Sequence, residues 1–131
     1  MAQKITTFLM FEGVAEQAML FYVSLFNDSE VRNIERYETD DPDTEGPVKV
    51  AQFTLCGHEM TCSDSPVKHD FTFTPSISLF VDCNTEEELD EAFNRLSDGG
   101  SVLMPPDNYG FSKKFAWVND RYGVSWQLNL A

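Results

Sequence analysis

The segment Gly123-Val124-Ser125-Trp126-Gln127 follows a turn near the end of the chain, and Gly57-His58-Glu59-Met60-Thr61 follows a turn near its middle. Each begins with a glycine suited to a tight turn and continues as the second strand of a predicted hairpin. When the two glycines are aligned, Thr61 corresponds to Gln127. Outward from these hairpins, both halves of the chain show the same predicted order of elements: strand, helix, strand, strand, strand.

The first half is predicted to contain one helix and four strands. Apolar residues recur at helical spacing over residues 14–25, and Asn27-Asp28 ends that helix. Apolar and β-prone segments predict strands at residues 5–11, 29–37, 48–55 and 59–63. The acidic segment 38–47 is predicted to be a hairpin loop. Calcium binding is not expected there, because Pro42 interrupts the segment and the spacing is not that of an EF-hand.

The second half repeats this order after a linker at residues 64–75. Thr85 and Glu88 form a capping-box pattern in front of a helix, which Gly99-Gly100 ends. Strands are predicted at residues 76–82, 101–103, 113–119 and 124–130, with a Pro-containing loop at residues 104–110. The sequence therefore predicts one α+β domain over residues 1–131, with module one at about residues 1–64 and module two at about residues 76–131.

Two aspartates lie next to the predicted hairpin strands. Asp64 follows the fourth strand, and Asp120 begins the last turn. A short acidic side chain at such a place commonly accepts hydrogen bonds from nearby backbone amides. A structural role is therefore predicted for both residues.

Composition and charge exclude several classes of partner. The formal net charge of −13 would repel phosphate backbones, so no nucleic-acid partner is expected. No apolar run approaches the roughly 18 residues that cross a bilayer, and no secretory signal pattern is present, so no membrane partner is expected either. The three cysteines have no CxxC spacing, which predicts reduced thiols in a cytoplasmic protein. Each is predicted to be a small buried residue rather than a nucleophile.

Three local patterns, together with the doubled element order, resemble a known family. They are Phe21-Tyr22 in the first helix, Tyr109-Gly110-Phe111-Ser112 before the last hairpin, and Asp120-Arg121-Tyr122-Gly123-Val124-Ser125-Trp126-Gln127 within it. The chain resembles the PhnB-like branch of the glyoxalase/vicinal-oxygen-chelate superfamily, which is often labelled demethylubiquinone methyltransferase-like. The likeness extends over nearly the whole chain, and the last third is its most specific part.

This resemblance implies a glyoxalase/bleomycin-resistance-like fold of paired βαβββ modules whose mixed sheets curl around a cavity, usually in a homodimer. Whether the cavity forms within one chain or across a domain-swapped dimer stays open. Metal-using members take their ligands from the first and fourth strands of each module. These positions are expected at Thr7 and Thr61 in the first module, and at Ser76 and Gln127 in the second.

The four expected ligand positions contain hydroxyl and amide groups, where metal-using members place His or Glu. Neutral hydroxyls and amides are weak ligands for a divalent metal such as zinc or nickel. His58 and His69 lie in a turn and a linker, and no spacing pairs them as ligands. The sequence therefore predicts no metal and no other cofactor.

Alternation along two strands predicts which side chains face the cavity. If Ser76 and Gln127 point into it, so do Ser78, Phe80 and Ser125, while the opposite side is an aliphatic and aromatic row that packs on the helix. An ordinary solvent-exposed sheet face would show the same alternation.

An aromatic group precedes and enters the next-to-last predicted strand. Tyr109 and Phe111 flank Gly110 in a loop, and Trp117 lies in the strand. These rings are predicted to form an aromatic wall for the ligand, although aromatic residues at this density are also typical of core. Because of their loop position, Tyr109 and Phe111 are the better candidates for ligand contact.

Three classes of function follow. The first is a metal-free small-molecule binding protein. The second is a metal-independent enzyme in which Glu59, two residues from Thr61 and predicted to share its sheet face, acts as the general base. The third is a dimeric scaffold with a vestigial cavity. The methyltransferase label lacks support, because no glycine-rich loop follows the first strand and no alternating βαβ run is present.

Overall fold

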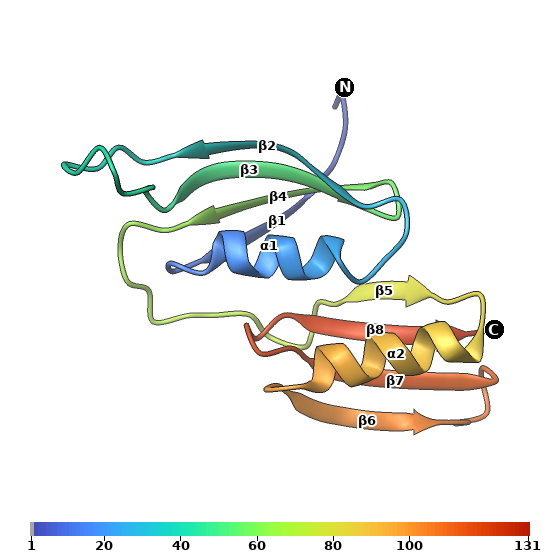
Figure 1. Ribbon diagram of the computed structural model, residues 1–131. Coiled ribbons are helices and arrows are strands. Elements are labelled where there is room, and N and C mark those ends of the chain that lie inside the picture. The colour runs from blue at the N-terminus through green and yellow to red at the C-terminus, as the bar shows by residue number, and fades with distance from the viewer. Residues whose placement is uncertain (1) are drawn as a thin grey trace. The chain divides into compact units, whose positions relative to one another are not determined.

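Each half of the chain forms a four-stranded sheet with one helix, in a computed structural model that describes residues 2–131 (Figure 1). The chain divides into two compact units, Met1–His69 and Asp70–Ala131. The first unit contains β1 (Thr7–Phe11), α1 (Ala15–Val23), β2 (Glu30–Arg36), β3 (Val48–Leu55) and β4 (His58–Asp64). The second unit contains β5 (Leu79–Asp82), α2 (Glu86–Ser97), β6 (Ser101–Asp107), β7 (Lys114–Asn119) and β8 (Ser125–Leu130).

The two sheets have the same topology. The strand order is β1-β4-β3-β2 in the first unit, here sheet A, and β5-β8-β7-β6 in the second unit, here sheet B. In each sheet the first strand runs parallel to the last, and the other neighbours are antiparallel. The predicted α+β class with two βαβββ modules is therefore confirmed.

The registers of the two sheets also correspond. Thr61 pairs with Phe8 and Gln52 in sheet A, as Gln127 pairs with Phe80 and Trp117 in sheet B. The register between β2 and β3 shifts at Arg32, and that between β6 and β7 shifts at Leu103, at matching places in the two sheets. These two residues have no partner across the ladder, as expected of bulges.

Each helix covers one face of its own sheet. α1 contacts β2, β3 and β4, and α2 contacts β6, β7 and β8. Side chains alternate along each strand, so every second residue points to the helix. The buried residues on that side of the sheets include Phe53, Met60, Cys62, Trp126 and Leu128. The opposite side of each sheet is not packed on the helix and is called its helix-free face.

The two aspartates predicted to bind backbone amides do so. The carboxylate of Asp64 accepts hydrogen bonds from the amides of Gly13, Ala15 and Val48, at 2.8, 2.9 and 3.0 Å. Asp120 accepts from the amides of Tyr122 and Val124, at 2.8 and 3.0 Å, and its second oxygen accepts from the Trp126 indole at 2.9 Å. Both carboxylates are buried, and both are used to hold turns in place.

The predicted capping box before α2 is present. Thr85 Oγ1 accepts a hydrogen bond from the Glu88 amide at 3.2 Å, and the Glu88 carboxylate accepts one from the Asn84 amide at 3.0 Å. These contacts satisfy amides that the first helical turn leaves without partners.

Three predicted strand boundaries were wrong by two residues or more. β1 begins at Thr7 rather than at residue 5. β6 continues to Asp107 through Pro105 and Pro106, where a loop was expected, because β6 is an edge strand and an edge tolerates residues that cannot donate to the ladder. β5 begins at Leu79 rather than at residue 76.

The cysteines differ in exposure. Cys62 is buried as predicted and Cys83 is half-buried, but Cys56 is exposed, so its prediction as a buried residue was wrong. Cys56 and Gly57 form the two-residue turn between β3 and β4, with φ values of 50° and 78°. Positive φ at both positions is what a tight hairpin turn of this length requires. Neither helix in residues 2–131 is long and apolar enough to span a membrane.

Candidate functional site

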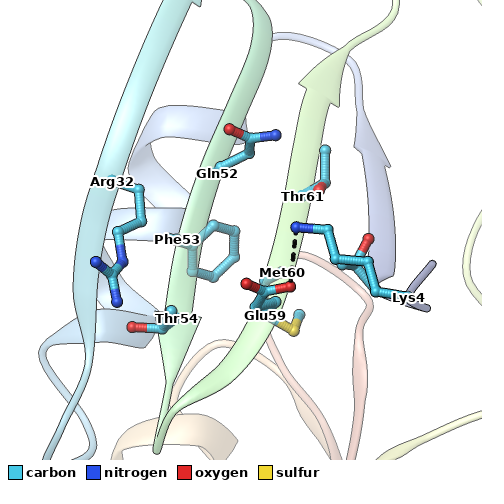
Figure 2. Close-up of a pocket in the computed structure, with 9 residues that line it drawn as sticks. Lys4, Arg32, Gln52, Phe53, Thr54, Glu59, Met60 and Thr61 are labelled. Atoms are coloured by element: carbon cyan, nitrogen blue, oxygen red, sulfur yellow. Dashed lines mark ion pairs between the residues drawn. The ribbon is translucent and has the colours of Figure 1, made fainter.

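A groove of about 360 Å³ lies on the helix-free face of sheet A (Figure 2). The polar side chains that line it include those of Lys4, Arg32, Gln52, Thr54, Glu59 and Thr61. They come from the segment before β1 and from three neighbouring strands, as Figure 2 shows. The groove therefore combines two cations and one carboxylate with amide and hydroxyl groups.

Strand pairing brings four of these side chains together. Gln52 pairs with Thr61, and Thr54 pairs with Glu59, across the β3–β4 ladder. Directly paired residues have their side chains on the same face of a sheet. Two adjacent pairs therefore point to the helix-free side, while Phe53 and Met60 between them are buried.

Alternation along β2 accounts for the position of Arg32. Val31 pairs with the buried Phe53 and points to the helix, so the next residue, Arg32, points to the helix-free side. A bulge follows, because Asn33 pairs with Gln52 and leaves Arg32 without a partner across the ladder. The Arg32 side chain thereby lines a groove formed mainly by β3 and β4.

The charged groups of the groove are paired but accessible to solvent. Lys4 Nζ lies 3.2 Å from a carboxylate oxygen of Glu59, and the two side chains are 62% and 53% exposed. Arg32 lies 3.2 Å from Glu30, with side chains that are 60% and 62% exposed. Exposed ion pairs contribute about 0–1 kcal/mol to stability, so Lys4 and Arg32 can each exchange their partner at little cost.

The helix-free face of sheet B contains a hydrogen-bonded polar group. The hydroxyls of Ser78 and Ser125 are 2.7 Å apart. The Trp117 indole donates to Ser125 Oγ at 2.9 Å, and the Gln127 amide donates to Ser78 Oγ at 3.3 Å. Side chains from β7, from β8 and from the residue before β5 thus form one network. Ser78, Ser125 and Gln127 share a face, as the predicted alternation requires.

Aromatic rings lie at one end of the second unit. Phe111 and Phe115 are 5.0 Å apart between ring centroids, and Tyr109 lies 6.3 Å from each. Phe80 lies 6.4 Å from Phe115. Phe115 is buried, whereas Phe80 and Phe111 are 56% and 63% exposed. The expected aromatic wall is therefore part core and part open surface.

Two predicted site residues do not occupy the expected strand positions. Thr7 pairs with Met60, lies on the side of the sheet opposite to Thr61, and hydrogen-bonds His58 at 3.0 Å. Phe8 has the first-strand position next to Thr61 instead. Ser76 precedes β5 and hydrogen-bonds Thr74 at 2.8 Å, and Phe80 pairs with Gln127 in its place.

Glu59, the predicted general base of the enzyme alternative, is neither isolated nor enclosed by apolar side chains. Glu59 does lie in the groove with Thr61, but Lys4 pairs with it and solvent reaches it.

Sequence reasoning did not identify Lys4, Arg32, Gln52 or Thr54. The alternation of Gln52 and Thr54 with apolar residues in β3 is a signal that could have placed both on the helix-free face. Arg32 follows the apolar Val31 in β2, which is a signal of the same kind. Lys4 lies outside the regular elements and reaches the groove through tertiary structure alone.

Comparison with known proteins assigns the chain to a family. The family model described as 3-demethylubiquinone-9 3-methyltransferase matches residues 3–129. The chain belongs to this PhnB-like family. A PhnB protein from Bacillus cereus is 60% identical, with a TM-score of 0.92 over 98% of this chain and 100% of that one. No curated protein matches the sequence significantly.

More distant structures share the fold of this PhnB-like chain. A protein from Pseudomonas aeruginosa has a TM-score of 0.83 at 22% identity, over 98% of each chain. The fosfomycin resistance protein FosX from Listeria monocytogenes, complexed with Mn(II) and a dihydroxypropylphosphonic acid, has a TM-score of 0.65 at 14% identity. That match covers 98% of this chain and 93% of FosX. The predicted glyoxalase/bleomycin-resistance-like fold is thus confirmed.

Proposed function

We propose that this PhnB-like protein binds a small organic molecule on a helix-free sheet face, without a metal or other cofactor. The groove on sheet A is the observation that supports this most directly. Its volume of about 360 Å³ lies within the range of small-molecule sites, and its amide and hydroxyl groups can orient a ligand. The open rings of Phe80 and Phe111 in the second unit offer a further apolar contact surface.

The donor atoms at the register positions support metal independence. The residues paired at the first and last strands are Phe8 with Thr61, and Phe80 with Gln127. A phenylalanine has no donor atom, and a neutral hydroxyl or amide is a weak ligand for a dication. Among residues 2–131, no group of three or more His, Cys, Asp or Glu side chains is placed to hold a metal ion. These residues do not fit the cation that FosX binds.

The enzyme alternative is less well supported. A general base needs a free carboxylate within reach of a substrate proton, whereas Glu59 forms an ion pair with Lys4 in an open groove. We do not assign the methyl transfer of the family name to this chain, because neither mixed sheet is the parallel, doubly wound sheet that binds nucleotide-like cofactors.

A fragment titration tests the proposal. Isotope-labelled protein, treated with EDTA, is screened by amide NMR against neutral fragments with amide, hydroxyl and aromatic groups. We expect saturable shifts at Gln52, Thr54 and Thr61. For a fragment that hydrogen-bonds the Gln52 amide, Gln52→Ala should weaken binding about fivefold to tenfold, the value of one neutral hydrogen bond.

The matched control is Gln17→Ala, which removes an exposed glutamine from α1. It should leave the dissociation constant unchanged. Absence of saturable shifts on both helix-free faces would favour the scaffold alternative. Binding that begins only after addition of a divalent metal would contradict metal independence.

The homodimer and the cytoplasmic location belong to the same proposal. Each sheet has one face without a helix, and a sheet that buries only one face gains from a partner surface. Reduced cysteines accord with a cytoplasmic setting. Both stay predictions.

A further inference from the structure

The two helix-free faces differ in chemistry at equivalent register positions. The bulged residue is Arg32 in sheet A and Leu103 in sheet B. Gln52 in sheet A corresponds to Trp117 in sheet B, because each pairs with the equivalent residue of the last strand. The same sheet topology therefore places a guanidinium and an amide on the first unit, and an aliphatic and an indole side chain on the second.

Cations are few in this chain, and two of them line one groove. The sequence contains nine Lys and Arg residues against twenty-two acidic ones. Lys4 approaches the groove from the segment before β1, and Arg32 approaches it from β2. The amide and hydroxyls of Gln52, Thr54 and Thr61 lie between β2 and β1 on the same surface (Figure 2). A guanidinium, an ammonium and neutral donors together are the set of groups that binds an oxyanion.

We infer that the groove of the first unit binds a small oxyanion, a carboxylate or a phosphate-type group, between Arg32 and Lys4. This inference rests on the proposed function and names the chemical class of its ligand. The Arg32 fork suits two oxygens of one anion, and the Lys4 ammonium supplies a point charge. Glu59 and Glu30 are the groups that face these cations in the absence of ligand.

The inference predicts the direction in which a change at Glu59 alters anion affinity. If its carboxylate competes with the ligand for Lys4, removal of its charge should strengthen anion binding. If Glu59 were a general base, the same change would instead abolish catalytic activity. Because the Lys4–Glu59 pair is exposed, the exchange of partners is inexpensive.

The test uses inorganic phosphate and acetate as probes, with sodium chloride at equal ionic strength as the reference. Amide shifts of the EDTA-treated protein should saturate around Gln52, Glu59 and Thr61. Lys4→Gln and Arg32→Gln should each weaken binding at least about fivefold, and Glu59→Gln should strengthen it about threefold. A preference for acetate or phosphate distinguishes a planar from a tetrahedral ligand group.

Charge-matched controls are available. Lys49→Gln removes an exposed cation from β3, and Glu87→Gln removes an exposed carboxylate from α2. Both should change anion binding less than twofold, roughly the effect of net charge alone. Equal effects of Lys49→Gln and Arg32→Gln would overturn the inference. If neutral fragments bind the groove and both anions fail to, the inference falls while the proposed function stands; if nothing binds, both fall.

Discussion

Replacement of Asp64 by alanine is expected to lower the free energy of unfolding by about 3–5 kcal/mol. Its two carboxylate oxygens accept hydrogen bonds from the amides of Gly13, Ala15 and Val48. These amides belong to the β1–α1 connection, to the first residue of α1 and to the start of β3, so one side chain joins three parts of the first unit. Alanine would leave the three donors without that acceptor in a buried place.

Urea unfolding followed by circular dichroism measures this loss. Asp64→Asn should also destabilise, because one amide oxygen can serve Gly13 and Ala15 while the amide nitrogen would face the Val48 N–H. Asp40→Ala, in the exposed loop after β2, is the matched control and should change stability by less than about 0.5 kcal/mol. Equal stabilities of the Asp64 and Asp40 variants would contradict the structural role of Asp64.

Alkaline pH is expected to destabilise the fold through Cys62. Burial, and secondarily the negative charge of Asp64, raise the pKa of the Cys62 thiol from an ordinary value of 9.0 to about 12. The folded state therefore holds the thiol neutral, while the unfolded chain ionises it near pH 9. The resulting stability is complete below pH 9 and is lost as the pH rises toward 12, at about 1.4 kcal/mol per unit.

The comparison of wild type with Cys62→Ala isolates this effect, because lysine and tyrosine residues titrate alike in both. Urea unfolding at pH 8, 9, 10 and 11 gives the difference in stability between the two proteins. We expect that difference to be constant up to about pH 8.5 and then to shift against the wild type by roughly 2–3 kcal/mol at pH 11. Parallel pH profiles would show that the buried thiol does not titrate as described.

Much of the fold could be predicted because its signals are local. The capping box at Thr85 and Glu88, and the helical spacing before Asn27-Asp28, depend on residues close in sequence. The bounds of β3, Val48–Leu55, agree with the prediction because a turn and a loop flank that strand. β6 was cut short because Pro105 and Pro106 suggest a loop until the strand is known to lie at an edge.

The candidate site was less predictable because it depends on side-chain direction and on tertiary contacts. In β1 the sequence Thr7-Phe8-Leu9-Met10-Phe11 is apolar on both faces, so alternation did not show which residues face away from the helix. An error of one residue moves every side chain of a strand to the other face. Thr7 was therefore chosen where Phe8 lies. Arg32 contributes to the groove because β2 pairs with β3, and local alternation does not define which strands are neighbours.

We propose that the helix-free faces hold no metal ion, because Phe8 with Thr61, and Phe80 with Gln127, supply no strong ligand there. Titration of EDTA-treated, isotope-labelled protein with Mn²⁺ tests it most directly, because the ion broadens amide signals near its binding site. We predict no saturable broadening around Thr61 or Gln127 at Mn²⁺ concentrations up to about 1 mM, and only diffuse effects at the acidic loop. Broadening centred on Thr61 or Gln127 that saturates at one ion per chain would contradict the claim.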